Sequence, residues 1–508
     1  MNDSGPAGAL DGAGRAEPAP GGGAARAEPV PGGGAGRAEP APSDGAGRAE
    51  PAPGGGGGAR LVRARHVLTS GPLGAVRDGA VAVVDGRIAA VGGFAELRAE
   101  HPAAPVVGAG TGILTPGFVS CHGHFSEGLV TGIGEAHTLW EWFVHVTEPI
   151  EAHLTREMAY VGTLLKTAEL ALSGVTTVAD MFCSAPRPEP VTPGVVEALD
   201  RVGLRGDVSF GPSDAADPRP VAAYLAEHEA LRQAAESSRR TRFRVGLGTV
   251  PTTGDALLAA TATLAREVGR LHVHLHEVRE EVTQSRMRRG TSPVRYAEQI
   301  GLLDAQVVAA HCVWLDDDDI AVLRRCEVAV AHCPVSNMIL ASGVAPVPRL
   351  LRDGVTVGLG VDGPASNDSQ NMLETLKIAA LLQKVHHLQA TALTAPAVLD
   401  MATAGGARAL GLADEVGSLE VGKSADLALF EGPPLTAIHD PYQALVYCAS
   451  VREVAHVWVA GEPVVTDGRL VGLDLTDVLP RARELAAALA RAAGLDSDLA
   501  RDPAAIPS

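Results

Sequence analysis

The chain has 508 residues and a mass of 52.0 kDa, enough for one large domain and a smaller one. Its formal net charge of −18 excludes nucleic acids and anionic membrane surfaces as expected partners, because both are negatively charged themselves. The chain has no run of about 18 apolar residues and no secretory signal pattern, and its six cysteines are scattered without a CxxC pair, which together indicate a cytoplasmic protein with free thiols.

Residues 1–57 form a repeat of low complexity. The tetrapeptide Arg-Ala-Glu-Pro recurs every 11 residues, separated by Gly-rich and Pro-Ala spacers. A segment with almost no bulky apolar side chains cannot offset the entropy lost on ordering by burial. An 11-residue period would suit a helical supercoil, but glycine and proline disfavour that helix. We therefore predict a disordered tail.

Short β-type runs follow the repeat and return near the end of the chain. The runs within residues 60–84 precede the dipeptide Asp85-Gly86, which favours a hairpin turn between two strands. The same texture recurs at residues 425–430 and 454–465. Both pieces are expected to form one small β-sandwich domain that brackets the central segment. An Ala-, Leu- and Arg-rich stretch behind the second piece predicts a terminal helix.

Between the two β pieces the pattern alternates strand and helix. Eight strand–helix units are the number expected of an α/β fold with a (β/α)8 TIM-type barrel, whose chemistry lies at the C-terminal ends of the strands. The candidate strands are residues 117–122, 175–181, 205–210, 244–249, 271–276, 306–311, 328–332 and 355–361. The expected organisation is a tail at 1–57, a small β domain in two parts at 58–113 and 412–474, the barrel at 114–411, and a C-terminal helix and tail at 475–508.

Four histidines and one aspartate fall at the ends of these strands. Residues i and i+2 of a strand point to the same side, so His122 and His124 can reach one ion together. A further histidine and a carboxylate from distant strands would complete a catalytic metal site with an open position for water. A single histidine in such a place is more often a core residue, but five such residues favour a metal-dependent hydrolase. The five are His122, His124, His274, His311 and Asp362.

Spacing alone does not decide which histidine of the fifth candidate strand binds the metal. His272, His274 and His276 share one face, so either neighbouring pair could form a second HxH motif. Glu277 lies three residues past His274 and places a proton carrier just beyond the strand end, which favours His274. We expect His272 to be a core residue or to contact a ligand from behind. For His276 the pocket wall remains one option.

These motifs, in this order and spacing, resemble the amidohydrolase superfamily. They are most similar to its cytosine-deaminase and chlorohydrolase branch, and within that branch to the methylthioadenosine/S-adenosylhomocysteine deaminases. The resemblance runs from about residue 59 to residue 470. The motifs that carry it are His122-Gly-His124, His274-x-x-Glu277, Ala310-His311-Cys312, Val361-Asp362-Gly363, Trp140-Glu-Trp142, Pro149-Ile-Glu151 and His332-Cys-Pro-Val-Ser336-Asn337.

The resemblance implies a role for each residue at the reacting centre. One divalent metal ion would be bound by two histidines of the first strand, one of the fifth and the aspartate of the eighth: His122, His124, His274 and Asp362. Such an ion lowers the pKa of its bound water towards ~7, and Asp362 could take the proton. His311 would hydrogen-bond the water or the developing oxyanion, and Glu277 would protonate a ring nitrogen of the substrate. Zn²⁺ is the expected ion, and Fe²⁺ or Mn²⁺ would also fit.

The substrate side of the resemblance is less complete. It implies four substrate-binding residues, namely Glu151, Trp142, Ser336 and Asn337. Two polar residues of the family's nucleoside deaminases are replaced here, an arginine by Phe210 and a histidine by Val250. Without them the pocket should no longer hold a charged homocysteine tail by the same contacts.

The predicted function is a metal-dependent aminohydrolase that replaces an exocyclic amine of a purine-like or other N-heterocyclic compound with oxygen and releases ammonia. The alternative within the fold is a chlorohydrolase or cyclic amide hydrolase acting on a triazine-like ring. A non-enzymatic barrel would be expected to have a damaged set of metal ligands, and this set is complete. The expected partner is a small heterocyclic molecule rather than a nucleic acid or a membrane, and a homo-oligomer is left open.

Overall fold

The computed structural model describes residues 58–495, apart from 134, 136, 216 and 217. The tail predicted for residues 1–57 and the last 13 residues of the predicted C-terminal segment, 496–508, lie outside the described residues. Among those that are described, no helix is long and apolar enough to cross a bilayer.

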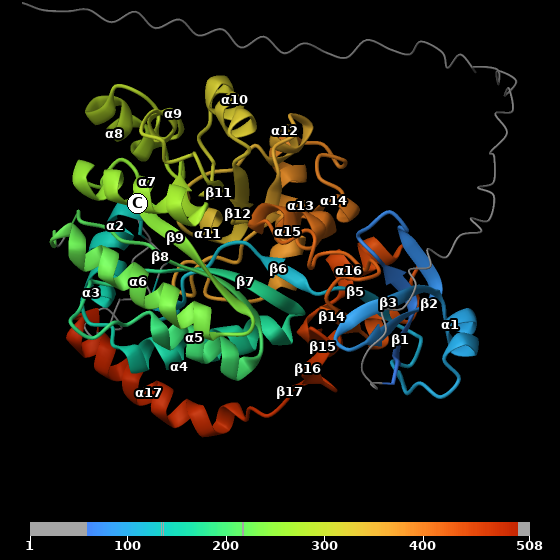
Figure 1. Cartoon of the computed structure of the whole chain (residues 1–508). Helices are drawn as coiled ribbons and strands as arrows, with labels where there is room; N and C mark the ends of the chain where they lie inside the picture. The colour runs from blue at the N-terminus through green and yellow to red at the C-terminus, as the bar shows by residue number, and fades with distance from the viewer. Residues whose placement is uncertain (1–57, 134, 136, 216–217, 496–508) are drawn as a thin grey trace, which may run out of the picture. The chain divides into compact units, whose positions relative to one another are not determined.

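Eight parallel strands form the barrel, as predicted (Figure 1). Each pairs with the next along the chain, and the ends of the sheet meet where the amide of Cys121 donates to the carbonyl of Leu359 at 2.7 Å. The strands are almost wholly buried because helices cover them from outside. Their bounds are β6 Phe118–Ser120, β7 Val175–Phe182, β8 Arg205–Phe210, β9 Thr241–Thr249, β10 Arg270–Leu275, β11 Gln306–His311, β12 Ala329–His332 and β13 Val357–Leu359.

Several helices between and after these strands begin at a residue whose side chain caps the first turn. For example, Asp316 caps α10 and forms a reciprocal capping box with Asp319, so the acidic run there is a helix start, as its sequence indicates. The helices of the barrel are α4 Arg156–Leu172, α5 Pro193–Val202, α6 Val221–Ser237, α7 Asp255–Val268, α8 Arg279–Arg289, α9 Pro293–Gln299, α10 Asp317–Arg325, α11 Pro334–Ile339, α12 Val347–Arg352, α13 Met372–His387, α14 Ala395–Met401 and α15 Ala404–Leu410.

The first and last parts of the described chain build one separate nine-stranded sheet, the blue and orange-red strands of Figure 1. Its two halves join where β5 pairs with both β1 and β14. The predicted hairpin turn is present, with Asp85 and Gly86 at φ 48° and 76° between β2 and β3. The strands are β1 Arg60–Leu68, β2 Ala75–Val84, β3 Arg87–Gly93, β4 Val106–Val107, β5 Ile113–Pro116, β14 Leu427–Phe430, β15 Val454–Val459, β16 Glu462–Thr466 and β17 Arg469–Leu470.

The remaining helices flank these two sheets. The terminal helix α17 packs on α4, and its N-cap is Asp474. Three short consecutive segments, α2, η2 and α3, lead from the first barrel strand into α4, and η2 is a π-helix. These elements are α1 Phe94–Glu100, η1 Phe125–Glu127, α2 Leu139–Trp142, η2 Phe143–Thr147, α3 Glu148–Glu151, η3 Pro433–Leu435, α16 Pro441–Cys448, η4 Val451–Glu453 and α17 Leu475–Ala492.

A buried ion pair ties the early parts of several barrel strands together. Arg244 of β9 and Asp207 of β8 are both fully buried, with Nη2 of the arginine 2.8 Å from Oδ2 of the aspartate. The same guanidinium donates to the carbonyl oxygens of Leu271, Gln306 and Leu410 at 3.2, 3.0 and 2.9 Å. It therefore links β8, β9, β10, β11 and the end of α15 on the side of the barrel opposite the C-terminal ends of the strands.

We predict that Asp207→Asn lowers the free energy of unfolding by about 3–5 kcal/mol, because it leaves the buried Arg244 charge without its partner. Glu197→Gln is the control, since Glu197 pairs with Arg156 on the exposed surface, and should change stability far less. Urea denaturation of both variants measures the difference. Equal stabilities would contradict a structural role for the pair.

The pH dependence of this stabilisation follows from the pKa of Asp207. Burial alone would raise this pKa, but Arg244 and Arg242 lower it to about 2. Since the folded-state pKa lies below the unfolded value, the pair stabilises the fold above about pH 4, and this contribution is lost as the pH falls towards 2.

Candidate metal centre and active site

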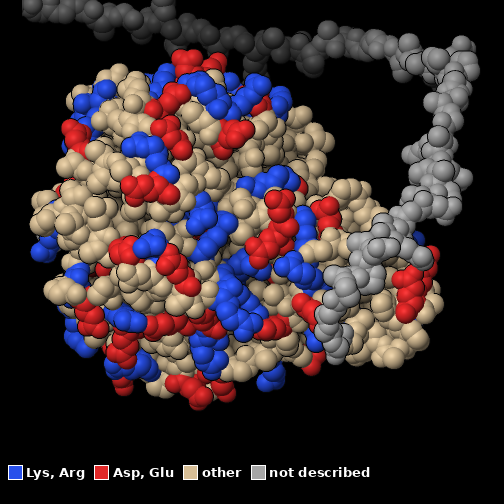
Figure 2. Space-filling model, viewed as in Figure 1, with Lys and Arg blue, Asp and Glu red and all other residues tan. Residues whose placement is uncertain are grey.

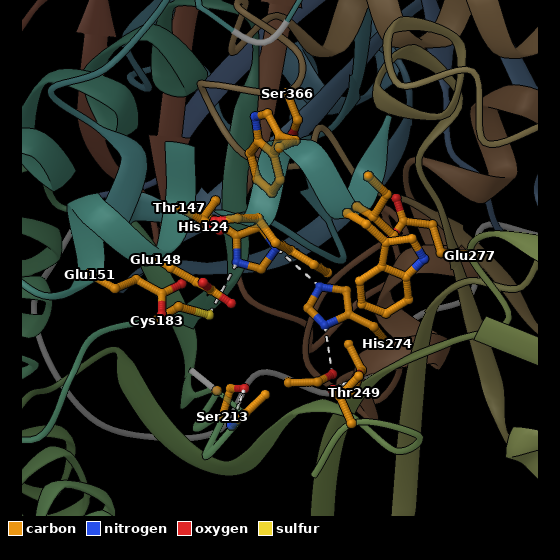
Figure 3. Close-up of a pocket in the computed structure, with 18 of the residues that line it drawn as sticks. His124, Thr147, Glu148, Glu151, Cys183, Ser213, Thr249, His274, Glu277 and Ser366 are labelled. Carbon is orange, nitrogen blue, oxygen red and sulfur yellow. Dashed lines mark hydrogen bonds between the residues drawn. The ribbon is translucent and has the colours of Figure 1, made fainter. Parts of the chain in front are cut away.

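Three histidines and an aspartate from three places in the chain meet at the C-terminal ends of the barrel strands. The Nε2 atoms of His124 and His274 lie 3.1 Å apart. Oδ1 of Asp362 lies 3.3 Å from Nε2 of His122 and 3.5 Å from Nε2 of His124. Figure 3 shows His124 and His274 facing each other in the centre of the site. The possible ligands fall into two overlapping groups, His122 with His124 and His274, and His122 with His311 and Asp362, so the four residues predicted to bind a metal lie together with His311 beside them.

Each imidazole is held from behind through its other nitrogen. Nδ1 of His124 donates to the carbonyl of Met181 at 2.7 Å, and Nδ1 of His274 donates to the carbonyl of Gly248 at 2.9 Å. Because a carbonyl only accepts, the proton of each neutral ring sits on Nδ1 and Nε2 carries a lone pair. Nδ1 of His122 lies 2.8 Å from Nε2 of His272.

This donor set fits a cation. Two Nε2 lone pairs face each other at 3.1 Å beside a carboxylate oxygen, an arrangement that a positive charge between them stabilises. Nε2 of His122 is buried and has no hydrogen-bond partner among the described residues. Burial, with the neighbouring His122, lowers the pKa of His124 to about 4, which leaves His124 neutral, the form that binds metals.

The backbone around the site is strained where two of its residues stand. His311 and Asp362 have φ angles of 71° and 67°, a left-handed conformation that side chains with a Cβ rarely adopt. Strain of this kind costs about 1–3 kcal/mol per residue and concentrates at functional sites.

β6 ends at Ser120, so His122 and His124 converge from the segment just past the strand rather than from within it.

His311 and Glu277 stand together beside the four ligands. Nε2 of His311 lies 3.5 Å from Oε2 of Glu277 and 3.8 Å from Oδ2 of Asp362. Burial raises the pKa of the Glu277 carboxyl. Burial alone would lower the pKa of His311, but the carboxylates of Glu277 and Asp362 raise it. The arrangement can therefore store and move a proton within reach of the metal ligands.

Ser336 and Asn337 lie behind the reacting groups, in α11. Oγ of Ser336 donates to Oδ2 of Asp362 at 2.5 Å, and Oδ1 of Asn337 accepts from Nδ1 of His311 at 2.9 Å. Both residues are buried, and neither side chain lines the cavity. Their contacts orient Asp362 and His311.

The two histidines flanking His274 on β10 differ in their surroundings. His272 contacts His122 from behind, one of the two roles expected for it. His276 faces away from the cavity, where Nδ1 donates to the carbonyl of Trp314 at 2.7 Å and Nε2 accepts from the amide of Val294 at 3.2 Å. Placing His276 on the pocket wall was wrong, because the chain turns left-handed there, at φ 58°, and breaks the alternation of the strand.

The metal-binding group opens into a cavity of about 330 Å³, within the range usual for small-molecule sites. One wall is made by α2, η2 and α3, whose π-helix is of a kind often found at functional sites. Glu277 borders one side and Glu148 and Glu151 the other (Figure 3). Its principal lining residues are His124, Glu127, Trp140, Trp142, Phe143, Thr147, Glu148, Glu151, Cys183, Ser213, Thr249, Thr252, His274, Glu277, His311, Asp362 and Ser366.

Glu151 and Trp142, both predicted to touch the substrate, border this cavity. Burial raises the pKa of Glu151 to about 8, and the nearby Glu148 adds to the effect. Phe210 and Val250 do not border it: both are fully buried, and the Phe210 ring packs edge-on against His228 at 5.2 Å. The pocket argument based on these two side chains was therefore wrong in its geometry. The cavity still has no lysine or arginine among its described lining residues.

Glu127 is a cavity residue that sequence reasoning missed. Its side chain is buried, and Oε2 accepts from the amide of Ala365 at 2.9 Å. Gly363 leaves room for this carboxyl, since a Cβ at that position would overlap it. The available signal was spacing, because Glu127 follows His124 by three residues, as Glu277 follows His274.

We predict that Gly363→Ala lowers turnover by about 10²-fold, because it forces the Glu127 carboxyl and the adjoining Asp362 out of position. Gly123→Ala is the matched control. Its new methyl group would lie 3.5 Å from the carbonyl of Asp362 and 3.6 Å from that of Ala179, both ordinary contacts. Steady-state kinetics of the two variants should separate them, and equal activities would show that this packing does not position the site.

Comparisons with known proteins agree with the geometry. The Amidohydrolase family model matches residues 113–464, and a bacterial imidazolonepropionase-like composite domain matches residues 79–104. A 5-methylthioadenosine/S-adenosylhomocysteine deaminase of Nitratidesulfovibrio vulgaris strain DP4 is 38% identical over 418 residues, covering 80% of this chain and 92% of that protein. A 5'-deoxyadenosine deaminase of Methanothermobacter thermautotrophicus is 38% identical over 433 residues, covering 83% of this chain and 98% of the relative.

Solved structures are similar over nearly their whole length. An adenosine deaminase from Xanthomonas campestris with bound zinc superposes with a TM-score of 0.79 at 30% identity, covering 85% of this chain and 98% of that one. The atrazine chlorohydrolase of Arthrobacter aurescens TC1 complexed with zinc gives 0.77 at 27% identity, covering 84% and 99%. Fold, ligand geometry and sequence similarity together show that this chain belongs to the amidohydrolase family.

Proposed function

We propose that this protein is a metal-dependent deaminase that replaces the exocyclic amine of a purine-like ring with oxygen. The observation that carries the proposal is the position of Glu277. Its buried carboxyl faces the cavity beside His311 and is not one of the four grouped metal ligands. A carboxyl there suits a ring nitrogen of a substrate whose adjacent carbon lies over the metal-binding group. The names of the 38%-identical relatives support an amine on an adenine ring.

The residues at the centre divide the chemistry among them. His122, His124, His274 and Asp362 would hold a divalent ion, which when bound would lower the pKa of a water and supply hydroxide near neutral pH. Asp362 would take up the proton of the attacking water, with its carboxylate oriented by Ser336. His311 donates to the oxygen that adds to the ring carbon.

Glu277 then serves two proton transfers. It gives its proton to the ring nitrogen next to the attacked carbon, and it then passes the proton taken up by Asp362, relayed by His311, to the departing amine. The proton left on the added hydroxyl returns to Glu277 as the ring carbonyl forms. One water is consumed and one ammonia released, and the ring keeps the oxygen. We propose zinc as the ion, since imidazole with one carboxylate suits it and both zinc-bound structures above share the fold.

A second candidate keeps the same centre and changes the leaving group. The similarity to the atrazine chlorohydrolase, at a TM-score of 0.77, favours a displacement of chloride from a triazine-like ring. Ring protonation by Glu277 would help both reactions. A panel of amino-heterocycles and chlorinated triazines, assayed in parallel for ammonia and chloride, decides between them.

We predict that Glu277→Gln retains bound metal and loses at least about 10²–10⁴-fold in turnover, because the amide cannot carry a proton between the two transfers. Ammonia release and elemental analysis of the same preparation measure both quantities. Glu281→Gln is the control, since Glu281 is also buried but accepts from the Glu277 amide outside the cavity lining. Near-normal turnover of Glu277→Gln would refute the assigned role.

We also predict a preference against substrates whose tail carries a carboxylate, as the zwitterionic homocysteine tail does. The described cavity lining contains Glu127, Glu148 and Glu151 and no lysine or arginine that could pair with a carboxylate. 5'-Deoxyadenosine or methylthioadenosine should therefore have a higher kcat/KM than S-adenosylhomocysteine. Glu148→Gln should bring the kcat/KM values of these substrates closer together. A strong preference for S-adenosylhomocysteine would contradict this account of the pocket but not the proposed deamination.

The surface charges and the cysteines support the proposed partner and compartment of the protein. Figure 2 shows basic and acidic residues interspersed over the visible face, which supports a small-molecule substrate rather than a nucleic acid. All six cysteines are free thiols, which supports the cytoplasm as the compartment.

A further inference from the structure

We propose that His272 is the positioning residue that makes His122 a metal ligand. The inference rests on the proposed metal-dependent function. Of the three ligand imidazoles, those of His124 and His274 are held by main-chain carbonyls, with Sγ of Cys183 a further 3.9 Å contact to Nδ1 of His124, whereas Nδ1 of His122 contacts the side chain of His272. The support of His122 can therefore be removed by mutation without altering the backbone.

The hydrogen bonds behind His122 form a chain that ends on the backbone. Nδ1 of His122 lies 2.8 Å from Nε2 of His272, and Nδ1 of His272 lies 3.4 Å from Oγ of Ser209. Oγ of Ser209 donates to the carbonyl of Asp180 at 2.8 Å. The carbonyl can only accept, so it sets the direction of the whole chain.

That direction decides whether His122 can bind a cation. With the serine proton on the Asp180 carbonyl, Oγ accepts from Nδ1 of His272, whose Nε2 then accepts from Nδ1 of His122. His122 is left with a bare Nε2, which lies 3.3 Å from Oδ1 of Asp362. In the reverse direction Nε2 of His122 would carry a proton and could not bind metal. His272 thus selects the binding tautomer as well as the ring orientation.

Burial makes this support necessary. His122 and His272 have no exposed surface, so no bulk water can replace a lost partner. The deeper position of His272 on β10 keeps it out of the cavity lining, so a substitution there removes no side chain that borders the cavity.

The test compares His272→Leu, His272→Gln and a matched control, His332→Leu. Leucine fills the space without an acceptor, whereas the glutamine oxygen stands close to the position of Nε2. His332 lies on strand β12, two strands from β10, is equally buried, and its ring nitrogens have no hydrogen-bond partner among the described residues. Zinc affinity is measured by competition with a chromogenic chelator, and the visible spectrum of the Co²⁺-loaded protein reports ligand geometry.

We expect His272→Leu to lose about 10–100-fold in zinc affinity and to change the Co²⁺ spectrum. His272→Gln should recover most of the affinity, and His332→Leu should match the wild type. Equal zinc affinity and spectrum in His272→Leu and His332→Leu would overturn the proposal.

A Ser209→Ala variant keeps the test decisive if His272→Leu does not fold. Loss of its Oγ should weaken zinc binding and broaden the Co²⁺ spectrum by relaxing the direction of the chain, and an unchanged affinity would count against the inference. None of these readouts needs a substrate. A wild-type protein that binds no divalent ion would instead refute the proposed function itself.

Discussion

The close approach of three imidazoles and one carboxylate is the constraint on which the rest of this structure depends, with Nε2 of His122 and of His124 beside Oδ1 of Asp362 and Nε2 of His274 beside that of His124. Alone, such a group of donors is unfavourable, because Nε2 atoms 3.1 Å apart repel when neither carries a proton. The fold imposes it by hydrogen bonds to the opposite nitrogen of each ring. A bound cation would turn this repulsion into coordination, and metal binding would then stabilise the barrel.

Closure of the barrel makes this convergence possible. β6 and β13, the first and last strands, meet through main-chain bonds, and the amide of Asp362 donates to the carbonyl of His122 at 3.2 Å. His122 and Asp362 are 240 residues apart in sequence, and closure fixes them at the same end of the barrel. The Arg244–Asp207 pair braces the opposite side, while the strained backbone of His311 stands on the reactive side. The buried ion pair and the strained residue thus lie at opposite ends of the barrel strands.

Much of this arrangement could be predicted from the sequence. The eight apolar runs predicted the barrel, and their ends predicted the ligand group, because strand direction alone places those ends on one face. The spacing of Glu277 from His274 led to a carboxyl that does face the cavity. These predictions depend on periodicity, which tertiary packing preserves inside a buried sheet.

The features that could not be predicted depend on loop conformation. The side of the chain on which His276 falls is decided just past the end of β10, where its own left-handed conformation reverses the alternation. Ser336 belongs to a short helix whose orientation has no periodic signal, so its contact with Asp362 could not be separated from a contact with substrate. Glu127 was missed because it lies in a single 3-10 turn after the HxH motif.

The central claim is that one ion at this group drives hydrolytic release of ammonia. Its most direct test is a zinc titration of the metal-stripped protein, with ammonia release from an adenine nucleoside followed at each addition. The account predicts no activity at the start, a linear rise, and a plateau at one equivalent of zinc per chain. Full activity without metal, or a rise that ends only at two equivalents, would contradict it.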